Sequence, residues 1–448
     1  MANTAILGGG MLGLELARKL RASGDSVTVF EAAPQLGGLA SAWTLGGVTW
    51  DKHYHVVLLS DLNTQALLAD LGLSDDFVGV TTKTGFYTDG KLYSMSNSVE
   101  FLRFPPLGLV SKLRLGGTIF LASRIKDWKR LESVPVADWL RKWSGRRTFE
   151  RIWLPLLRSK LGEGYRQTSA AFIWATIARM YAARRSGLKR EMFGYVRGGY
   201  ARVLARFAED LADAGVAVQT DSPVESVTRQ SDSVRVTLSN GDAHEFDRVV
   251  LTAPTHVVSR LVPQLTASEH ARLNAVKYQG IVCASVLLRK PLERFYVTNI
   301  TESWVPFTAV IEMSALVDRS EFGGHSLVYL PKYVAPDDAI FDESDDSIRT
   351  RFVAALARMY PHFSPGDVLD FRVSRVRSVF ALSTLNYSAT VPPMATSLPG
   401  VFVVNSAQIV NGTLNVNETL GQAAAAATAL AEVGEPVDVG APLVGARR

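Results

Sequence analysis

The sequence has almost no cysteine, since Cys283 is the single one among 448 residues. One cysteine excludes an intramolecular disulfide, and we expect a reducing, cytoplasmic compartment for this chain. Cys283 lies in an uncharged run, 281–288, which predicts a buried strand. The thiol is therefore predicted to be a core residue and not a nucleophile.

Long hydrophobic runs are also missing. No stretch of about 18 uncharged apolar residues occurs, so we expect no membrane-spanning helix. The first residues lack the basic start of a secretory signal peptide. The excess of positive charge is small, with a formal net charge of +5. It permits an anionic partner but gives no reason to expect nucleic acid.

Glycine, by contrast, is plentiful near the start of the chain. Gly8, Gly10 and Gly13 follow a short apolar run, fit the pattern G-x-G-x-x-G and precede an amphipathic segment. A second apolar run ends on Glu31, 18 positions past Gly13, close to the spacing of a dinucleotide-binding βαβ unit. In such a unit the glycines let a pyrophosphate approach the helix N-terminus, and the acid accepts hydrogen bonds from ribose hydroxyls. The glycines alone would also suit a plain βα turn, but strand, helix, strand and acid all follow in order.

Three segments of the chain look like parts of a nucleotide-binding domain, namely 1–60, 190–255 and 398–432. The segments between them, 61–189 and 256–397, do not show this pattern. We therefore predict an α/β fold with a discontinuous Rossmann-like nucleotide-binding domain and an inserted α+β substrate domain in two pieces. The last residues, 433–448, are predicted to form a flexible tail.

Local patterns predict several individual elements. Residues 61–71 read as a short helix, and Asp89-Gly90 marks a hairpin turn. Residues 101–185 show mainly helical patterns. A later amphipathic helix is expected to end at Asp213, and the last helix is expected to span about 418–431.

This order of motifs resembles the flavin-dependent amine oxidase superfamily, which includes protoporphyrinogen oxidases and phytoene desaturases, with UDP-galactopyranose mutases as more distant relatives. The extension past Glu31, in which Gly37 and Gly38 precede Leu39, is similar to the loop that brings the backbone to the FAD pyrophosphate in that family. The resemblance implies FAD as the cofactor, since classical NAD domains lack this glycine pair. The alternative is an ordinary loop with two glycines.

The resemblance implies further cofactor contacts at four later positions. The glycine-pair turn 194–204 looks like the turn before the adenine-contacting strand, which places Val224 beside the adenine. Asn405 stands where the family usually has an aspartate that binds the ribityl chain. The closing helix would point N–H groups near Val416 and Asn417 at the flavin pyrimidine ring.

Two departures from the family pattern concern the chemistry. Amine oxidases often carry a lysine near flavin N5, but the comparable strand 278–288 has none. His53 and His55 stand where the family often has an Asp-x-Gly-x-His pattern, and at spacing i, i+2 they would share one face of a strand. They are the best candidates for catalytic residues and would line the flavin pocket. The alternatives are plain structural histidines or, less favoured, metal ligands, and we predict no metal site.

The substrate is expected to be an apolar or lipid-linked small molecule that gives a hydride to flavin N5, which makes the protein an FAD-dependent oxidoreductase. The apolar segment 104–110, followed by Lys112 and Arg114, suits either a peripheral contact with a membrane or a helix packed inside the substrate domain. Two other functions stay open. One is a non-redox mutase that acts on a sugar nucleotide, and the other is a flavin- or lipid-binding protein without catalysis.

Overall fold

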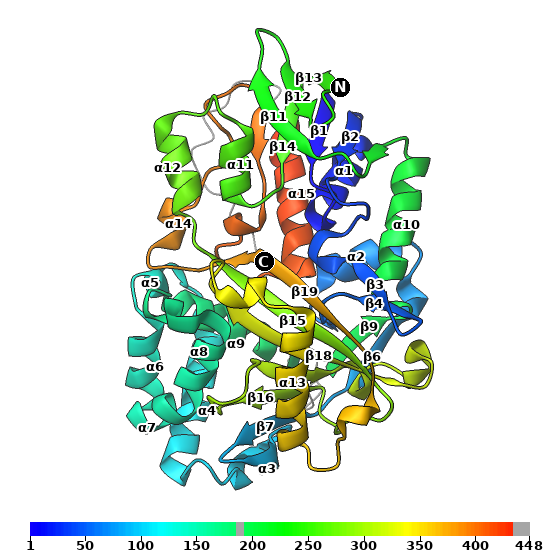
Figure 1. Ribbon diagram of the computed structural model, residues 1–448. Coiled ribbons are helices and arrows are strands. Elements are labelled where there is room, and N and C mark those ends of the chain that lie inside the picture. Colours follow the sequence, from blue (N-terminus) through cyan, green and yellow to red (C-terminus); the bar gives the residue numbers. More distant parts are fainter. Residues whose placement is uncertain (185–191, 433–448) are drawn as a thin grey trace.

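A five-stranded parallel sheet forms the upper part of the molecule in Figure 1, which shows a computed structural model that describes residues 1–184 and 192–432. The strand order is β10-β2-β1-β14-β20, and all four neighbouring pairs are parallel. The strands are β1 (Asn3–Leu7), β2 (Ser26–Phe30), β10 (Ala217–Gln219), β14 (Arg248–Leu251) and β20 (Val401–Val403).

Both faces of this sheet are covered, because successive side chains of a strand point to opposite sides. Ile6 of β1 faces a layer of four helices, whereas its neighbours Ala5 and Leu7 face a small antiparallel sheet and two further helices. The four helices are α1 (Met11–Ala22), α2 (Leu62–Asp70), α10 (Gly199–Asp213) and α15 (Val416–Glu432). The opposite layer consists of β11 (Val224–Arg229), β12 (Val234–Leu238), β13 (Ala243–Phe246), α11 (Thr255–Leu261) and α12 (Ala267–Ala275).

A second, seven-stranded sheet forms the lower part of the molecule, in the order β19-β15-β18-β17-β16-β7-β8. Strand β15, next to the edge strand β19, is buried along its whole length. Its Val282 and Val286 pack toward α13, and its Ile281 and Cys283 pack toward the other face. The elements are β7 (Thr84–Thr88), β8 (Lys91–Ser94), β15 (Tyr278–Leu288), β16 (Val297–Ile300), β17 (Ala309–Glu312), β18 (Ser326–Val334), β19 (Val368–Ala381) and α13 (Asp345–Met359).

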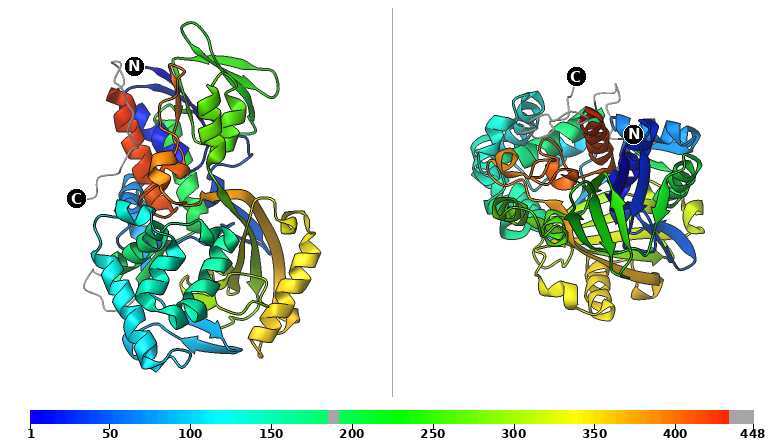
Figure 2. Two further views of the ribbon diagram at one scale, coloured as in Figure 1. Left: turned by 90° about the vertical axis from the view of Figure 1, so that its left-hand side faces the viewer. Right: turned by 90° about the horizontal axis from the view of Figure 1, so that it is seen from above.

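Helices fill the remaining side of this lower part, as the two views of Figure 2 show. They are α3 (Ser98–Arg103), α4 (Leu109–Arg124), α5 (Lys129–Glu132), α6 (Val136–Ser144), α7 (Arg146–Thr148), α8 (Leu154–Leu161) and α9 (Ala170–Arg184), with a π-helical turn, Phe149–Trp153, before α8. Among the described residues, none of the helices is both long enough and apolar enough to cross a membrane.

Two small sheets and one short helix complete the fold. The strands β3 (Ala42–Leu45) and β4 (Val48–Asp51) form a hairpin. The strands β5 (Val57–Leu58), β9 (Met192–Val196) and β6 (Phe77–Thr81) form the second sheet, and α14 is Tyr387–Thr390.

The structure confirms the predicted α/β fold, with a parallel nucleotide-type sheet and a second part of mixed α and β structure. The helix expected at 61–71, the hairpin at Asp89-Gly90 and the strand 278–288 are all present. The domain bounds stay a prediction. Helix α2 was assigned to the substrate domain, yet Leu67 and Leu68 pack in the same core as the parallel sheet. The predicted tail, 433–448, lies outside the described residues.

Candidate functional site

The first glycine turn joins the carboxyl end of β1 to the amino end of α1. Gly8 has φ +122°, and its N–H donates to the carbonyl oxygen of Phe30 at 2.8 Å. A Cβ on Gly13 would lie 1.9 Å from the carbonyl oxygen of Gly8, so only glycine lets the helix pack this closely. Gly10 is the N-cap residue of α1, and a Cβ there would meet no atom within 4 Å. The helix N-terminus therefore faces open space that fits a ligand phosphate.

Glu31 lies beside this turn. One carboxylate oxygen accepts the N–H of Gly9 at 2.6 Å, and the other accepts the N–H of Ala33 at 2.8 Å. A carboxylate has about four lone-pair positions, so it retains acceptor capacity for ribose hydroxyls. The N–H of Ser222 donates to the carbonyl oxygen of Glu31 at 2.9 Å. That contact brings the start of β11, with Val224, alongside Glu31, where the adenosine half of a dinucleotide would lie.

The glycine pair Gly37-Gly38 packs directly against the first turn. The N–H of Gly37 donates to the carbonyl oxygen of Gly9 at 2.8 Å, and Gly37 adopts φ +109°. A Cβ on Gly37 would lie 2.4 Å from Leu204 of α10, and one on Gly38 would lie 3.4 Å from the Cα of Gly10. These residues bring a second stretch of backbone to the N-terminus of α1. Both stretches together fit the pyrophosphate of a dinucleotide.

The second glycine pair, Gly198-Gly199, opens α10 and is anchored to β4. Gly199 has φ +64°, and the N–H of Tyr200 donates to Oδ1 of Asp51 at 2.8 Å. The N–H of Gly198 donates to Glu321 at 3.0 Å. The predicted amphipathic helix is confirmed, and this pair fixes its start against the hairpin β3–β4.

Asn405 follows β20 at the carboxyl end of the parallel sheet and is only 2% exposed. Its side-chain carbonyl accepts the N–H of Ala407 at 3.1 Å, and its amide nitrogen donates to the carbonyl oxygen of Ala253 at 2.9 Å. Both ends of the amide therefore have protein partners. The predicted contact with the ribityl chain stays untested, and it would use the remaining hydrogen-bonding capacity of this amide.

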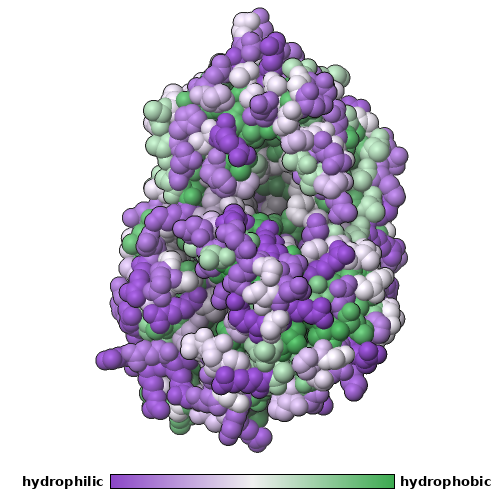
Figure 3. Space-filling model, in the orientation of Figure 1, coloured by the Kyte–Doolittle hydropathy of each residue, from purple (hydrophilic) through white to green (hydrophobic). Residues whose placement is uncertain are grey.

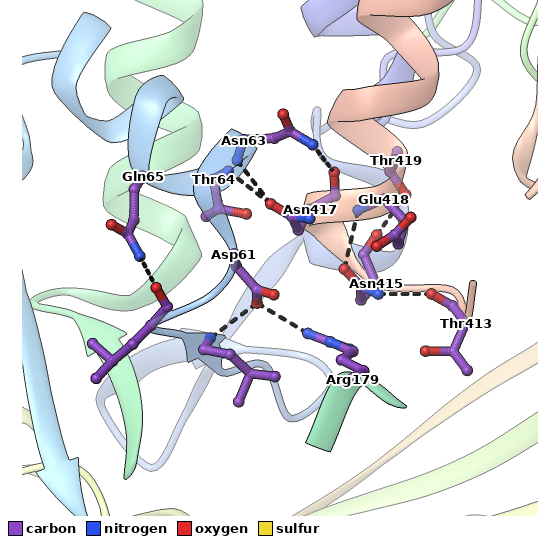
Figure 4. A network of polar contacts seen from close by, with 12 residues as sticks. Asp61, Asn63, Thr64, Gln65, Arg179, Thr413, Asn415, Asn417, Glu418 and Thr419 are labelled. Carbon is purple, nitrogen blue, oxygen red and sulfur yellow. Dashed lines mark hydrogen bonds and ion pairs between the residues drawn. The ribbon is translucent and has the colours of Figure 1, made fainter. Parts of the chain in front are cut away.

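Figure 4 shows the network at the amino end of α15. The helix begins at Val416, two residues before the expected start, because Oδ1 of Asn415 accepts the N–H of Glu418 at 3.1 Å and caps the first turn. Oδ1 of Asn417 accepts the N–H of Asn63 at 2.8 Å, which caps α2. The Asn417 side chain is thus used within the protein, so a flavin contact at Val416 and Asn417 would be made by their backbone N–H groups.

One expectation about His53 and His55 is wrong. They were predicted to share one face of a strand, but β4 ends at Asp51 and the segment 52–56 is irregular. The two rings therefore have different neighbours. Nδ1 of His55 lies 3.5 Å from Oδ2 of Asp51, and its ring lies 5.1 Å from that of Tyr200.

His53 is buried and joins the two parts of the molecule. Its Nδ1 lies 3.2 Å from the carbonyl oxygen of Leu39, next to the glycine pair, and its Nε2 lies 3.1 Å from Oγ of Ser374 on β19. Burial and the neighbouring His55 lower the pKa of His53 to about 4. The ring is therefore neutral near pH 7, with Nδ1–H donating to Leu39 and Nε2 accepting from the Ser374 hydroxyl.

The sequence marks the aromatic segment 329–333 as one that could wall a pocket or pack in the core, but it does not show that Tyr333 joins an aromatic cluster next to His53. The hydroxyl groups of Tyr54 and Tyr333 lie 2.7 Å apart, and the Tyr333 ring contacts Phe380 edge to face at 5.9 Å. The ammonium of Lys160 lies 4.1 Å from the centre of the Tyr333 ring. Burial, followed by the nearby Tyr333 hydroxyl, raises the pKa of Tyr54. These residues come from four distant segments, so no local pattern links them.

The strands also show which face of the lower sheet can meet a cofactor. Cys283 is paired with Ser374, so both lie on the face that carries His53. Cys283 is fully buried, which confirms the predicted core position, and this burial raises the pKa of its thiol. Lys332, the lysine on the neighbouring strand, is paired with Val282 on the opposite face, toward α13. It therefore does not replace the lysine that is missing from β15.

The surface between the two parts of the molecule is hollowed, as Figure 3 shows. In Figure 1 the five-stranded parallel sheet lies above this level and the seven-stranded sheet lies below it. Within 1–184 and 192–432, no three histidine, cysteine or acidic side chains gather in a way that could hold a metal ion.

A model of the family of flavin containing amine oxidoreductases matches residues 13–431. The chain belongs to this family. Its members are flavin enzymes, and the residues around Gly10 and Gly38 fit such a dinucleotide cofactor.

Individual relatives are distant. The chain is 24% identical over 290 residues to a 4,4'-diapolycopen-4-al dehydrogenase of Metabacillus indicus, a match that covers 58% of this chain and 57% of that protein. It is 21% identical to a chloroplastic/chromoplastic 15-cis-phytoene desaturase of an Oncidium hybrid cultivar, covering 81% of this chain and 65% of that one. The chain thus spans less than two thirds of the length of either relative. A solved putative protoporphyrinogen oxidase from Exiguobacterium sp. 255-15 shares the fold, with a TM-score of 0.75 at 16% identity, covering 96% of this chain and 99% of that one.

Proposed function

We propose that the protein is an FAD-dependent oxidoreductase that takes a hydride from an apolar or lipid-linked small molecule. The observation that carries this proposal is the packing of two glycine turns, at Gly10 and Gly38, which His53 joins to the lower sheet. There Tyr54, Tyr333 and Phe380 form a cluster that would serve as an aromatic wall. FAD, when bound, supplies the hydride acceptor at flavin N5.

The residues of this chain would bind, orient and shield the reactants. The open N-terminus of α1 at Gly10 and the backbone at Gly38 would hold the pyrophosphate, Glu31 the ribose, and Val224 the adenine. The N–H groups of Val416 and Asn417 would stabilise negative charge on the reduced pyrimidine ring.

Three side chains would lie near the flavin. Asn405 would lie near the ribityl chain. His53 would line the pocket as a neutral donor and acceptor, since its pKa of about 4 keeps it uncharged. His55 would keep its place through Asp51. This half-buried aromatic wall, with the Lys160 ammonium on the Tyr333 ring, would shield the reacting face from water and favour a largely apolar substrate.

A substrate of this class resides in membranes, so we also propose that the chain makes peripheral contact with a bilayer. The relatives named for diapolycopenal and phytoene support an apolar substrate. The cytoplasmic location that follows from one buried cysteine stays a prediction.

The redox proposal is tested by anaerobic titration of the FAD-loaded protein with carotenoid aldehydes, carotenes and porphyrinogens while flavin absorbance is followed. The proposal predicts that at least one of these classes bleaches the flavin. If none does, yet calorimetry shows that a ligand binds, the chain is a flavin- or lipid-binding protein without catalysis.

A non-redox mutase for a sugar nucleotide is the second candidate function. Such an enzyme needs arginines that converge on a diphosphate. Arg179, which lies next to the network at α15, is already paired with Asp61 at 3.0 Å. Activity that requires prior reduction of the flavin and leaves no net redox change would support the mutase instead.

A further inference from the structure

Large hydrophobic side chains gather on one outer surface of the helical part. Of the ten large hydrophobic residues that are exposed in the described part of the chain, seven lie on α3, α4 and the end of α6. Figure 3 shows hydrophobic residues at the lower edge of the molecule, where α3 and α4 lie in Figure 1. We call these seven residues the α3–α4 surface: Val99, Leu102, Leu109, Val110, Leu113, Phe120 and Trp143. Large exposed hydrophobic clusters on a protein surface commonly mark a site that binds another protein or a membrane.

Helix α4 buries two polar side chains along with Leu115 and Ala122, and it leaves large apolar side chains exposed. Leu113 is 65% exposed and Phe120 is 53% exposed, whereas Lys112 is only 8% exposed and Thr118 only 2%. The Lys112 ammonium donates to the carbonyl oxygen of Leu102 at 2.6 Å, and the Thr118 hydroxyl donates within its own helix at 2.7 Å. The inward polar groups are therefore satisfied inside the protein. The apolar face is left pointing outward in a stable arrangement.

The helices under this surface are firmly held. Phe104 and Leu107, between α3 and α4, are buried with Leu115 of α4 in a cluster that includes Phe86 of the lower sheet. The guanidinium of Arg114 lies within hydrogen-bond reach of the carbonyl oxygen of Trp143, which ties α4 to the end of α6. The surface is thus a fixed feature of the fold, and its apolar side chains remain exposed because nothing in the described chain covers them.

Positive charge surrounds the surface. Residues 98–150 contain eleven lysines and arginines against five acidic residues, a net charge of +6, whereas the whole chain carries +5. The exposed side chains of Arg103, Arg124 and Lys142 have no ion pair in the described part of the chain. These cations lie among the apolar residues, so a partner must offer both an apolar interior and negative groups.

We infer that the α3–α4 surface docks on a lipid bilayer that contains anionic headgroups. The apolar side chains would enter the boundary between headgroups and acyl chains, and the flanking arginines and lysines would meet lipid phosphates. A second copy of this chain is disfavoured as the occupant, because two surfaces with the same positive charge repel each other. The inference identifies the surface for the peripheral membrane contact proposed above, and it does not depend on the flavin chemistry.

Vesicle flotation of the FAD-loaded protein tests this docking. Vesicles of phosphatidylcholine with about 30% phosphatidylglycerol should bind the protein, and pure phosphatidylcholine should bind it at least about fivefold more weakly, the effect of one basic side chain at an anionic surface. The double variant Leu113→Ser and Phe120→Ser should lower binding at least about tenfold, since it removes two large apolar contacts. The matched control is Leu62→Ser on α2, a leucine that is 70% exposed but lies outside the surface. It should bind like the wild type.

A site-specific probe distinguishes docking from general adhesion. Because Cys283 is buried, Leu113→Cys and Leu62→Cys each provide a single accessible thiol for an environment-sensitive dye. The dye at position 113 should shift to the blue when anionic vesicles are added, and the dye at position 62 should not.

Three outcomes would overturn the inference. The first is absence of binding to anionic vesicles, and the second is equal loss of binding in the Leu62 control. The third is a concentration-dependent dimer in light scattering that the double variant abolishes, which would assign the surface to a second copy. Each of these leaves the redox proposal standing, because flavin bleaching is measured on the same protein without vesicles.

Discussion

His53 and Ser374 are joined by a hydrogen bond of 3.1 Å, although 321 residues separate them in the chain. The same histidine ring contacts the carbonyl oxygen of Leu39 beside the glycine pair. His53 therefore connects the cofactor loop of the upper part to the face of the lower sheet that would carry the substrate. Protonation would put a hydrogen on Nε2, which could then no longer accept from the Ser374 hydroxyl, and it would place a charge in a buried position.

The His53 ring makes the stability depend on pH. Burial lowers its pKa to about 4 in the folded chain, whereas an unfolded histidine has a pKa of about 6.5. Between these values the unfolded chain binds more protons, so stability is fully present above about pH 6.5 and falls as the pH drops toward 4. Between pH 7.5 and pH 5 the free energy of unfolding should fall in both proteins. In the variant His53→Gln, which keeps a donor and an acceptor, it should fall by about 2 kcal/mol less than in the wild type. Urea unfolding at the two pH values measures this, and equal losses in both proteins would contradict the assignment.

Gly13→Ala should damage the first glycine turn. The new Cβ would lie 1.9 Å from the backbone oxygen of Gly8, so α1 must move away from β1. We expect a loss of at least about 2 kcal/mol in the free energy of unfolding, together with loss of bound flavin. The control is Gly116→Ala on α4, where a Cβ meets no atom within 4 Å. It should stabilise the helix by about 0.5–1 kcal/mol. Similar unfolding curves for the two variants would show that the turn is not closely packed.

Arg248→Ala should be one of the costliest changes in the upper part. Its guanidinium pairs with the buried carboxylate of Asp25 and donates to Oγ1 of Thr4 at 2.7 Å. Removal leaves a buried charge without its partner, which costs about 3–5 kcal/mol. The exposed pair Arg235–Glu245 is the matched control, and Arg235→Ala should cost less than about 1 kcal/mol. Denaturant unfolding of both variants compares them, and equal costs would refute the ranking.

Tyr333→Phe tests the aromatic wall. The Tyr54 hydroxyl would lose its partner at 2.7 Å and stay buried, at a cost of about 1–3 kcal/mol. If the wall contacts the substrate, the variant should also slow flavin bleaching in the anaerobic titration while FAD content stays constant. Tyr93→Phe, on β8 and away from the wall, is the control and should change neither quantity. Unchanged bleaching in Tyr333→Phe would place the substrate elsewhere.

The sequence predicted best those features that depend on residues lying close together in the chain. Gly8, Gly10, Gly13 and Glu31 lie within one βαβ unit, where spacing alone fixes which groups meet. The apolar run 281–288 predicted a buried strand because such a run can be buried on both faces, and the strand in fact begins earlier, at Tyr278.

The features that it missed depend on contacts between distant segments. The hydroxyl pair Tyr54–Tyr333 joins residues 279 positions apart. The side chain of Asn417 caps α2, a use that its own neighbourhood does not reveal. The histidine segment was predicted as a strand because i, i+2 spacing suits one. In the folded chain Asp51 instead accepts the N–H of Tyr200, and β4 ends there.

The central claim is that FAD lies with its pyrophosphate at the open N-terminus of α1. The most direct measurement is the FAD affinity of the wild type and of Gly10→Ala, read from the flavin absorbance of each protein after saturation and dialysis. A Cβ at Gly10 meets no protein atom within 4 Å, and Gly10 has φ −78°, so the fold should keep its melting temperature. The methyl group would occupy the phosphate position, and we predict that FAD affinity falls about a hundredfold. A wild type that takes up no FAD, or a Gly10→Ala variant that binds FAD equally well, would contradict the account.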